Sequence, residues 1–278
     1  MLEYPEIKTI SLQAHKHLIG KTIVSARLLT PEKKFVFSSN TPDEFAQKLD
    51  GKTIGSARSC GNHLFLVTKA GPALNVGDTG GKMLFHQGEV TIPKKRDVQL
   101  DFDDGTFFTH SVTMWGFISV QTKAEMEGAI KSIRDEAMEP VRADADVEAF
   151  VGFVRGWPDA ERTNAKKLII SRKYFTGLGN GYAQDILWRS GVHPRRKMNT
   201  LSEEELRKLF CSFLDVVDEA TQAEGRTTER TLLNEPGRYE PAMYRGTLGA
   251  GCPMCGAVIE KFSFEGGACY ICPECQKV

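Results

Sequence analysis

Four cysteines near the carboxyl end constrain the fold of this chain more than any other feature. Cys252 and Cys255 form one C-x2-C pair, and Cys272 and Cys275 form a second pair after a 16-residue spacer. Two such pairs are typical of a tetrahedral zinc site with four thiolate ligands. Disulfides are the alternative, but we see no secretion signal. We expect one structural Zn²⁺, because four thiolates leave no open position for water.

The residues between the two cysteine pairs predict a small β structure. The stretch AVIEKFSFEGGACYI reads as two strands with Gly266-Gly267 between them. Glycines at the centre of two strand-like runs favour a hairpin turn. We therefore expect a zinc ribbon with its turn at these two glycines.

The pattern of the chain changes near residue 124, which predicts an α+β protein. A helix is expected at 6–18. Strand-like runs follow at 21–29, 34–39, 63–71, 97–110 and 116–122, and Asp-Gly at 104–105 is a hairpin signal. Helical patterns dominate afterwards, at 144–156, 164–174, 181–191 and 202–225. We expect an N-terminal β-sandwich with a flanking helix over 1–124, a helical domain over 125–240 and the ribbon over 241–278.

The charge of the chain is zero overall but is unevenly distributed. Zero net charge argues against a protein that coats polyanions indiscriminately. Residues 161–197 carry nine basic and two acidic side chains, a formal +7 that is typical of a contact with a polyanion. An apolar run of about 18 residues is missing. We expect a cytoplasmic protein without a membrane partner.

A glycine-rich turn lies inside the basic segment. The stretch FTGLGNGYAQDILWRSGVHP, residues 175–194, places Gly-Leu-Gly-Asn before a predicted helix. Backbone N–H groups of such a turn can hold a phosphate at the helix amino terminus. Asn180 adds an amide donor, and Lys166 lies one helix upstream. The alternative is a purely structural link between helices.

Together these features resemble the formamidopyrimidine-DNA glycosylase and endonuclease VIII family. The matching parts are the MLEYPEI start, the β-rich first half, the GLGNGYAQDIL and GVHP stretches, and the terminal cysteine ribbon. The resemblance implies a helix-two-turn-helix core and a base-excision repair hydrolase that acts on damaged or distorted duplex DNA. It implies phosphate contacts for Lys166 and Asn180, and a ribbon turn at Gly267 that touches DNA.

Five positions depart from the family pattern. Leu2 stands where members carry a catalytic proline, and Asn62 stands where they carry a lysine that contacts DNA. The loop that holds an Arg-Phe wedge in the family reads Val112-Thr113-Met114-Trp115-Gly116. Asp78 aligns with a void-filling residue, commonly methionine, and Gly267 aligns with an arginine.

These departures decide which chemistry is expected. Leu2 keeps Met1 attached, so the only α-amine is a primary one on a flexible residue, displaced by one position. A misplacement of about 1 Å can cost on the order of a hundredfold in rate, so we expect weak or absent strand-cleaving lyase activity. Glu3 could activate water as a general base, with Glu6 beside it. Stabilising the first helical turn is the alternative role of both carboxylates.

The changed wedge loop leaves two interpretations open. Met114 and Trp115 could fill the gap left by a flipped base, because apolar side chains can wedge between base steps. Packing within a hairpin is the other interpretation.

Two functions compete at the level of the whole chain. The first is a DNA glycosylase with altered specificity or chemistry, and the second is a catalytically silent member that binds DNA lesions. A zinc-ribbon protein that binds RNA or protein is a third interpretation. We expect DNA as the partner, a monomer, and an enzyme of the first kind.

Overall fold

The fold is seen in a computed structural model that describes residues 1–278 except 30–35, 89–92, 114, 141–144 and 172–173. The chain forms two compact units. The first comprises Met1–Asp135 and Ala223–Arg238, and the second comprises Glu136–Gln222 and Tyr239–Val278. The sequence predicted the segments 1–124, 125–240 and 241–278. The main difference is that residues 223–238 group with the β-rich half of the chain.

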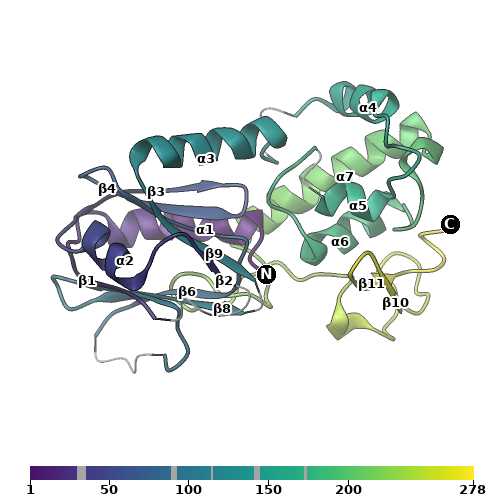
Figure 1. The fold of residues 1–278 in the computed structure, drawn as a ribbon. Helices are drawn as coiled ribbons and strands as arrows, with labels where there is room; N and C mark the ends of the chain where they lie inside the picture. Colours follow the sequence, from purple (N-terminus) through teal and green to yellow (C-terminus); the bar gives the residue numbers. More distant parts are fainter. Residues whose placement is uncertain (30–35, 89–92, 114, 141–144, 172–173) are drawn as a thin grey trace. The chain divides into compact units, whose positions relative to one another are not determined.

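The first unit contains two β-sheets whose strands are mainly antiparallel. One has the strand order β1-β7-β8-β6 and the other has the order β2-β9-β5-β4-β3. Figure 1 shows the two sheets as facing layers. Their strands are β1 (Ile23–Leu28), β2 (Val36–Ser38), β3 (Ile54–Cys60), β4 (His63–Thr68), β5 (Ala73–Gly77), β6 (Gly80–His86), β7 (Val98–Phe102), β8 (Phe107–Thr113) and β9 (Gly116–Gln121).

The hairpin predicted at Asp104-Gly105 is present between β7 and β8. The two strands pair antiparallel, with Leu100 opposite Phe108. Gly105 has a φ of 80°, a left-handed conformation that glycine adopts without steric cost. The Asp104 carboxylate accepts hydrogen bonds from the Thr106 N–H, at 3.1 Å, and from its hydroxyl, at 2.6 Å. These contacts fix the turn.

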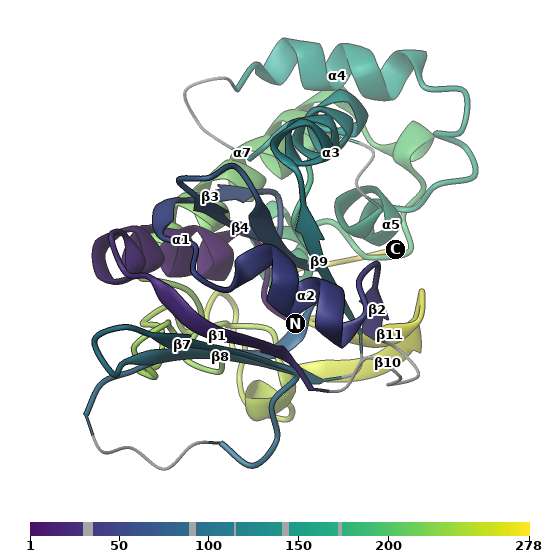
Figure 2. The same cartoon turned by 60° about the vertical axis from the view of Figure 1, so that its left-hand side comes forward.

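Three helices accompany the sheets: α1 (Tyr4–Leu18), α2 (Pro42–Leu49) and α3 (Lys123–Glu136). Helix α1 packs against β3 and β4, and it lies beside β3 in Figures 1 and 2. It buries Ile7, Ile10, Ala14 and Leu18, at the spacing expected of one helical face.

A hydrophobic core joins the two sheets and α1 of the first unit. It contains side chains from both sheets and from α1, together with the fully buried Leu232 from the returning segment 223–238. The Phe85 N–H donates to the Leu232 carbonyl at 2.8 Å, and the Leu232 N–H donates to Gln13 Oε1 at 2.9 Å. The predicted β-sandwich is therefore confirmed, and it is completed by residues far along the chain.

The second unit is helical and ends in a two-stranded ribbon. Its elements are α4 (Val147–Gly156), α5 (Ala165–Ile170), α6 (Asn180–Ser190), η2 (Met198–Thr200), α7 (Glu203–Gln222), η3 (Arg245–Thr247), β10 (Glu260–Phe264) and β11 (Gly267–Ile271). The predicted helices and the hairpin are thus present. Among the described residues, no helix combines the length and apolar character needed to cross a membrane.

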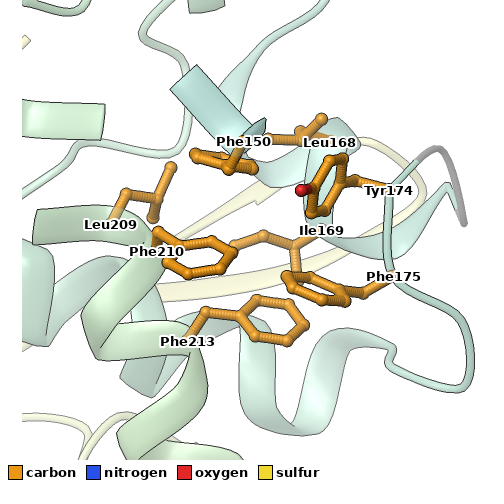
Figure 3. A pocket seen from close by; sticks show the side chains of 8 residues that line it. All are labelled: Phe150, Leu168, Ile169, Tyr174, Phe175, Leu209, Phe210 and Phe213. Carbon is orange, nitrogen blue, oxygen red and sulfur yellow. The ribbon is translucent and has the colours of Figure 1, made fainter. Parts of the chain in front are cut away.

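Aromatic side chains fill the space between the helices of the second unit. Figure 3 shows rings from α4, α7 and the segment after α5 turned toward one another, with aliphatic side chains beside them. Phe175 and Phe213 stack at 4.1 Å between ring centroids. The cavity left between them has a volume of only 10 Å³, so this is packed core.

The ribbon turn lies one residue before the predicted position. Glu265 and Gly266, with φ values of 48° and 70°, make the turn, and Gly267 is the first residue of β11. The prediction of a Gly266-Gly267 turn was wrong by one residue, because Glu265 adopts the left-handed conformation that glycine usually supplies.

Candidate active site and metal centre

Packing and hydrogen bonds fix the first residues of the chain. Leu2 is 1% exposed and belongs to the sandwich core, and its N–H donates to the Thr79 carbonyl at 2.9 Å. Glu3 is the N-cap of α1, and its N–H donates to Glu6 Oε2 at 2.9 Å. Glu6 therefore stabilises the first helical turn, which was one of its two predicted roles. Both carboxylates are 2% exposed.

A buried arginine lies between these carboxylates. Arg226 Nε is 3.0 Å from Glu6 Oε1, and Nη1 is 3.5 Å from Glu3 Oε1. Its Nη2 donates to the Met1 carbonyl at 2.9 Å and lies 3.6 Å from Glu229 Oε1. The guanidinium contacts both candidate catalytic carboxylates and the residue that carries the amine.

Two glycines let the arginine approach Glu6. Gly225 has a φ of 92°, and a Cβ at this position would lie 2.8 Å from Glu6 Cγ. A Cβ on Gly237 would lie 2.2 Å from the Gly225 carbonyl oxygen. The Arg226 N–H also donates to Glu6 Oε1 at 3.0 Å. Only a backbone free of side chains at both positions fits this close to α1.

Glu229 holds the α-amine. The Met1 nitrogen lies 3.5 Å from Glu229 Oε1, and the Met1 side chain is about half exposed. Two cations and three carboxylates thus meet at the start of α1. Glu229 contacts the Met1 amine and Arg226 contacts the Met1 carbonyl. These two contacts fix the position of the amine, although methionine lacks the rigid ring of a proline.

Sequence reasoning found Met1, Glu3 and Glu6 but missed Arg226 and Glu229. The Glu6 and Arg226 side chains are 220 residues apart in the chain. The one signal that could have pointed to a partner is physical, since two carboxylates buried on an apolar helix face need a cation nearby.

Two of the departures from the family pattern contact each other. Asn62 Nδ2 donates to Asp78 Oδ1 at 2.9 Å, and Asn62 is buried. His63 Nε2 lies 3.8 Å from the other Asp78 oxygen. Asn62 and Asp78 therefore form an interacting pair in this chain.

The wedge loop is described in part. Trp115 is 51% exposed and stacks on Phe37, with 6.1 Å between ring centroids and 19° between ring planes. It is not packed into the core. Met114 lies outside the described residues, so its predicted role stays a prediction.

The predicted phosphate contacts lie close to the ribbon in the second unit. Lys166 is 1% exposed, and its ammonium donates to the Phe264 carbonyl at 2.7 Å and to Cys269 Sγ at 3.4 Å. Asn180 is exposed at the first position of α6, and a Cβ on Gly267 would lie 3.0 Å from its Nδ2. Asn180 and Gly267 are neighbours, whereas the buried Lys166 side chain binds residues of the β10–β11 hairpin.

Ion pairs within the second unit reduce the free charge of segment 161–197. Arg189 binds both oxygens of Glu219 at 2.6 Å, and Arg196 binds Glu205 at 3.0 Å. Arg195 lies over the Phe262 ring at 4.5 Å. The formal charge of this segment therefore overstates the charge available to a partner.

The four predicted cysteine ligands come together. All four sulfur atoms lie within 4.8 Å of one another, with 3.9 Å between Cys252 and Cys275 and 3.3 Å between Cys255 and Cys272. A tetrahedral Zn²⁺ with bonds of about 2.3 Å requires sulfur atoms about 3.8 Å apart. The cluster fits a four-thiolate metal site.

The surroundings of Cys252 favour a metal-binding thiolate. Burial raises the pKa of Cys252, but hydrogen bonds from the N–H groups of Met254 and Cys255, from the Trp188 indole and from the Cys272 thiol together outweigh it and lower this pKa to about 6. The Trp188 Nε1–H donates to Cys252 Sγ at 3.3 Å. Hydrogen bonds to a ligand sulfur orient and stabilise a thiolate.

A buried carboxylate ties the helices to the ribbon segment. Asp185 of α6 accepts from the Tyr239 hydroxyl at 2.8 Å and from the N–H groups of Ala242, at 3.0 Å, and Met243, at 2.7 Å. These bonds fix the chain that leads to Cys252, so α6 and the metal site form one packed body within the second unit.

Comparison with known proteins agrees with this arrangement along the whole chain. Residues 1–111 match the formamidopyrimidine-DNA glycosylase N-terminal domain, and residues 137–231 match the formamidopyrimidine-DNA glycosylase H2TH domain. The formamidopyrimidine-DNA glycosylase of Enterococcus faecalis is 30% identical over 100% of this chain and 98% of its own. That of Rhodococcus erythropolis is 28% identical over 99% and 97%.

The fold is also that of solved structures. A Lactococcus lactis Fpg in complex with DNA containing an abasic site superimposes with a TM-score of 0.87, at 23% identity, over 99% of this chain and 100% of that one. A second complex of the same enzyme, with N7-benzyl-Fapy-dG DNA, gives 0.87 at 24% identity, with the same coverage. The chain belongs to the formamidopyrimidine-DNA glycosylase family.

Proposed function

We propose that the protein is a DNA repair glycosylase that binds damaged or distorted duplex DNA and hydrolyses an N-glycosidic bond. The observation that carries this is the buried Glu3 carboxylate at the start of α1, held by Arg226, which also binds the carbonyl of the residue that carries the α-amine, in a chain of this family. A fixed carboxylate next to an amine is a pair that can serve acid–base and nucleophilic chemistry at a sugar carbon.

Hydrolysis assigns the proton transfer to Glu3. The carboxylate accepts a proton from water as the water oxygen bonds to C1′, the bond from C1′ to the base nitrogen breaks, and the base leaves with a proton from solvent. Glu6 is committed to α1 and Arg226, so its role is to position the arginine. The products are a free base and an abasic sugar.

Strand cleavage requires the amine instead. Met1 must release its ion pair with Glu229 and lose a proton before it can attack C1′ and form a Schiff base. Leu2 fills the core where the family has its catalytic proline. We therefore propose a monofunctional glycosylase with weak or absent lyase activity.

A panel of lesion duplexes tests this function. Incubation with the unmodified protein should release a base and leave an abasic site without strand scission, until alkali cleaves it. Glu3→Gln should abolish release while binding persists, and Glu127→Gln, an exposed change on α3, should leave release unchanged.

The second candidate is a silent member that binds lesions. It is favoured by the ion pairs that Arg226 forms with Glu3 and Glu6 in this state. Binding of lesion duplexes without base release from any of them would establish it and refute the glycosylase.

We propose that the four-cysteine site holds one structural Zn²⁺ and that the protein acts as a monomer on DNA in the cytoplasm. Asn180 and Gly267 are proposed to face the DNA backbone, and Asn180→Ala is the sharper test of this face because its side chain is exposed. Binding should weaken by about the same factor on all sequences, since phosphate contacts do not read bases.

A further inference from the structure

Glu229 takes no part in the proposed hydrolysis, yet its carboxylate lies at the start of α1 between two positive charges. Its Oε1 atom is 3.5 Å from the Met1 α-amine and 3.6 Å from Arg226 Nη2. The Glu229 side chain is 20% exposed, whereas that of Arg226 is 7% exposed. A single carboxylate oxygen therefore bridges the chain terminus and the buried guanidinium.

The backbone around Glu229 is anchored to α1. The Glu229 N–H donates to the Arg226 carbonyl at 3.0 Å, and the Glu229 carbonyl accepts from the Gly237 N–H at 3.4 Å. Arg226 is bound to Glu6 Oε1 through its own N–H and through Nε, each at 3.0 Å. The segment that carries Arg226 thus also places the Glu229 carboxylate beside the amine.

Met1 is restrained on both sides of its Cα atom. Arg226 Nη2 donates to the Met1 carbonyl at 2.9 Å, and Glu229 contacts the amine. The next residue, Leu2, is buried in the core, and its N–H donates to the Thr79 carbonyl. Movement of the amine toward a substrate therefore requires that its contact with Glu229 break.

A carboxylate beside an amine can act in two opposite ways. It can take a proton from the amine and so produce a nucleophile, or it can hold the ammonium, which has no lone pair with which to attack a carbonyl carbon. Glu229 Oε1 is shared with Arg226, so this oxygen is placed to hold positive charge. The geometry favours the second role.

We propose that Glu229 is a positioning residue that locks the Met1 ammonium in an ion pair, so that the protein carries a latent Schiff-base activity toward aldehydes. Once the pair breaks and the amine gives a proton to solvent, its nitrogen bonds to the C1′ aldehyde of an abasic sugar. The aldehyde oxygen leaves as water, and a protonated imine remains. The choice of an abasic sugar rests on the proposed function, whereas the lock itself does not.

The first arm traps the imine with borohydride on a duplex that already contains an abasic site. Hydride reduces the imine to a secondary amine, which links protein and DNA covalently. Glu229→Gln should raise the trapped fraction by at least about three-fold, the order expected for loss of a partly exposed ion pair. Mass spectrometry should place the link on the amino-terminal peptide.

Glu235→Gln is the matched control, because it removes an exposed negative charge from the same returning segment. It should leave trapping at the wild-type level. Glu229→Gln should keep a cooperative urea transition, since Arg226 retains its pairs with Glu3 and Glu6. Trapping that is unchanged in Glu229→Gln would overturn the lock, and trapping that falls would assign Glu229 as a base instead.

The second arm needs no DNA. Formaldehyde and cyanoborohydride methylate free amines through the same kind of imine, and mass spectrometry of the amino-terminal peptide follows the Met1 α-amine alone. Methylation should be at least about three-fold faster in Glu229→Gln than in the wild type or Glu235→Gln. Equal rates in all three proteins would overturn the lock even if trapping rose, because the rise would then come from tighter DNA binding.

The two arms also separate this proposal from the glycosylase. Base release by the wild type in the lesion panel, together with unchanged trapping and methylation in Glu229→Gln, would refute the lock and leave the glycosylase assigned. Faster trapping and methylation in Glu229→Gln, without base release from any lesion, would refute the glycosylase and leave the lock assigned.

Discussion

Arg226 is the single residue on which the candidate site depends most. Its side chain is 7% exposed and faces two carboxylates that are 2% exposed. Removing one partner of a buried ion pair costs about 3 to 5 kcal/mol, because the remaining charges lose their compensation. We expect Arg226→Ala to lower the free energy of unfolding by this amount in urea titrations.

An exposed arginine provides the control for this change. Arg27 pairs with Asp101 at the surface, with 43% of its side chain exposed. Arg27→Ala should cost less than about 1 kcal/mol, as exposed pairs do. If Arg226→Ala and Arg27→Ala lowered the free energy of unfolding by the same small amount, the buried cluster would not depend on Arg226.

Asp104 in the β7–β8 turn predicts a pH dependence at the scale of one residue. Hydrogen bonds from Lys21 and then Thr106 lower the pKa of Asp104 from 3.8 to about 2. A lowered pKa means that the folded state favours the carboxylate, so the stabilisation is present above pH 3.8 and lost as the pH falls toward 2.

The comparison is between the wild type and Asp104→Asn in urea between pH 3 and 6. The variant should be less stable by under about 1 kcal/mol at pH 6, since 45% of the Asp104 side chain is exposed, and the difference should shrink toward pH 3. A difference that grew on acidification would contradict the assigned sign.

At the scale of elements, the ribbon should depend on its metal. We expect one equivalent of zinc, and a chelator that removes it should unfold β10 and β11, because metal binding and folding are coupled in such sites. Trp188 reports this directly, since its indole donates to Cys252 Sγ. Its emission should shift on chelation and recover with Zn²⁺. An unchanged emission after complete metal removal would contradict the site.

The first residue of β11 offers a gain-of-function test. Gly267→Arg places a cation beside Asn180, whose Nδ2 would give way by a few tenths of an ångström to the new Cβ. DNA affinity should rise, and the slope of log affinity against log salt should steepen by about 0.9, the value for one more phosphate contact. Ser263→Arg on β10, exposed on the same hairpin, should change the slope less. Equal slopes for both variants would mean that general charge, not position 267, acts on DNA.

Elements with strong local signals were predictable, and those set by tertiary packing were not. The Asp-Gly hairpin, α6, α7 and the cysteine ribbon follow from turn residues, helical spacing and ligand spacing. Strands β3, β5 and β6, with the sequences IGSARSC, ALNVG and GGKMLFH, were missed because small and polar residues obscure their alternation. The site was predictable only where its residues lie close in sequence, as Glu3 and Glu6 do, whereas Arg226 and the Asn62–Asp78 pair arise from folding.

At the scale of the whole molecule, the returning segment 223–238 should decide whether the sandwich folds. A fragment of residues 1–135 lacks Leu232, which is fully buried in its core, and Arg226. We expect this fragment to be unfolded or aggregated. Joining residues 223–238 to it through a flexible linker should restore a cooperative urea transition, and linking a scrambled segment should not. A cooperative transition of the fragment alone would show that the segment is dispensable.

The contact between Glu6 and Arg226 also sets an order of events during biosynthesis. The two side chains are separated by 220 residues, and a ribosome adds about 5 to 20 residues per second, so roughly 10 to 45 s pass between their syntheses. During that interval Glu6 of α1 and its N-cap Glu3 lack the cation that pairs with them. The candidate catalytic end of the protein is therefore made first, and it becomes complete only when the segment after α7 has left the exit tunnel.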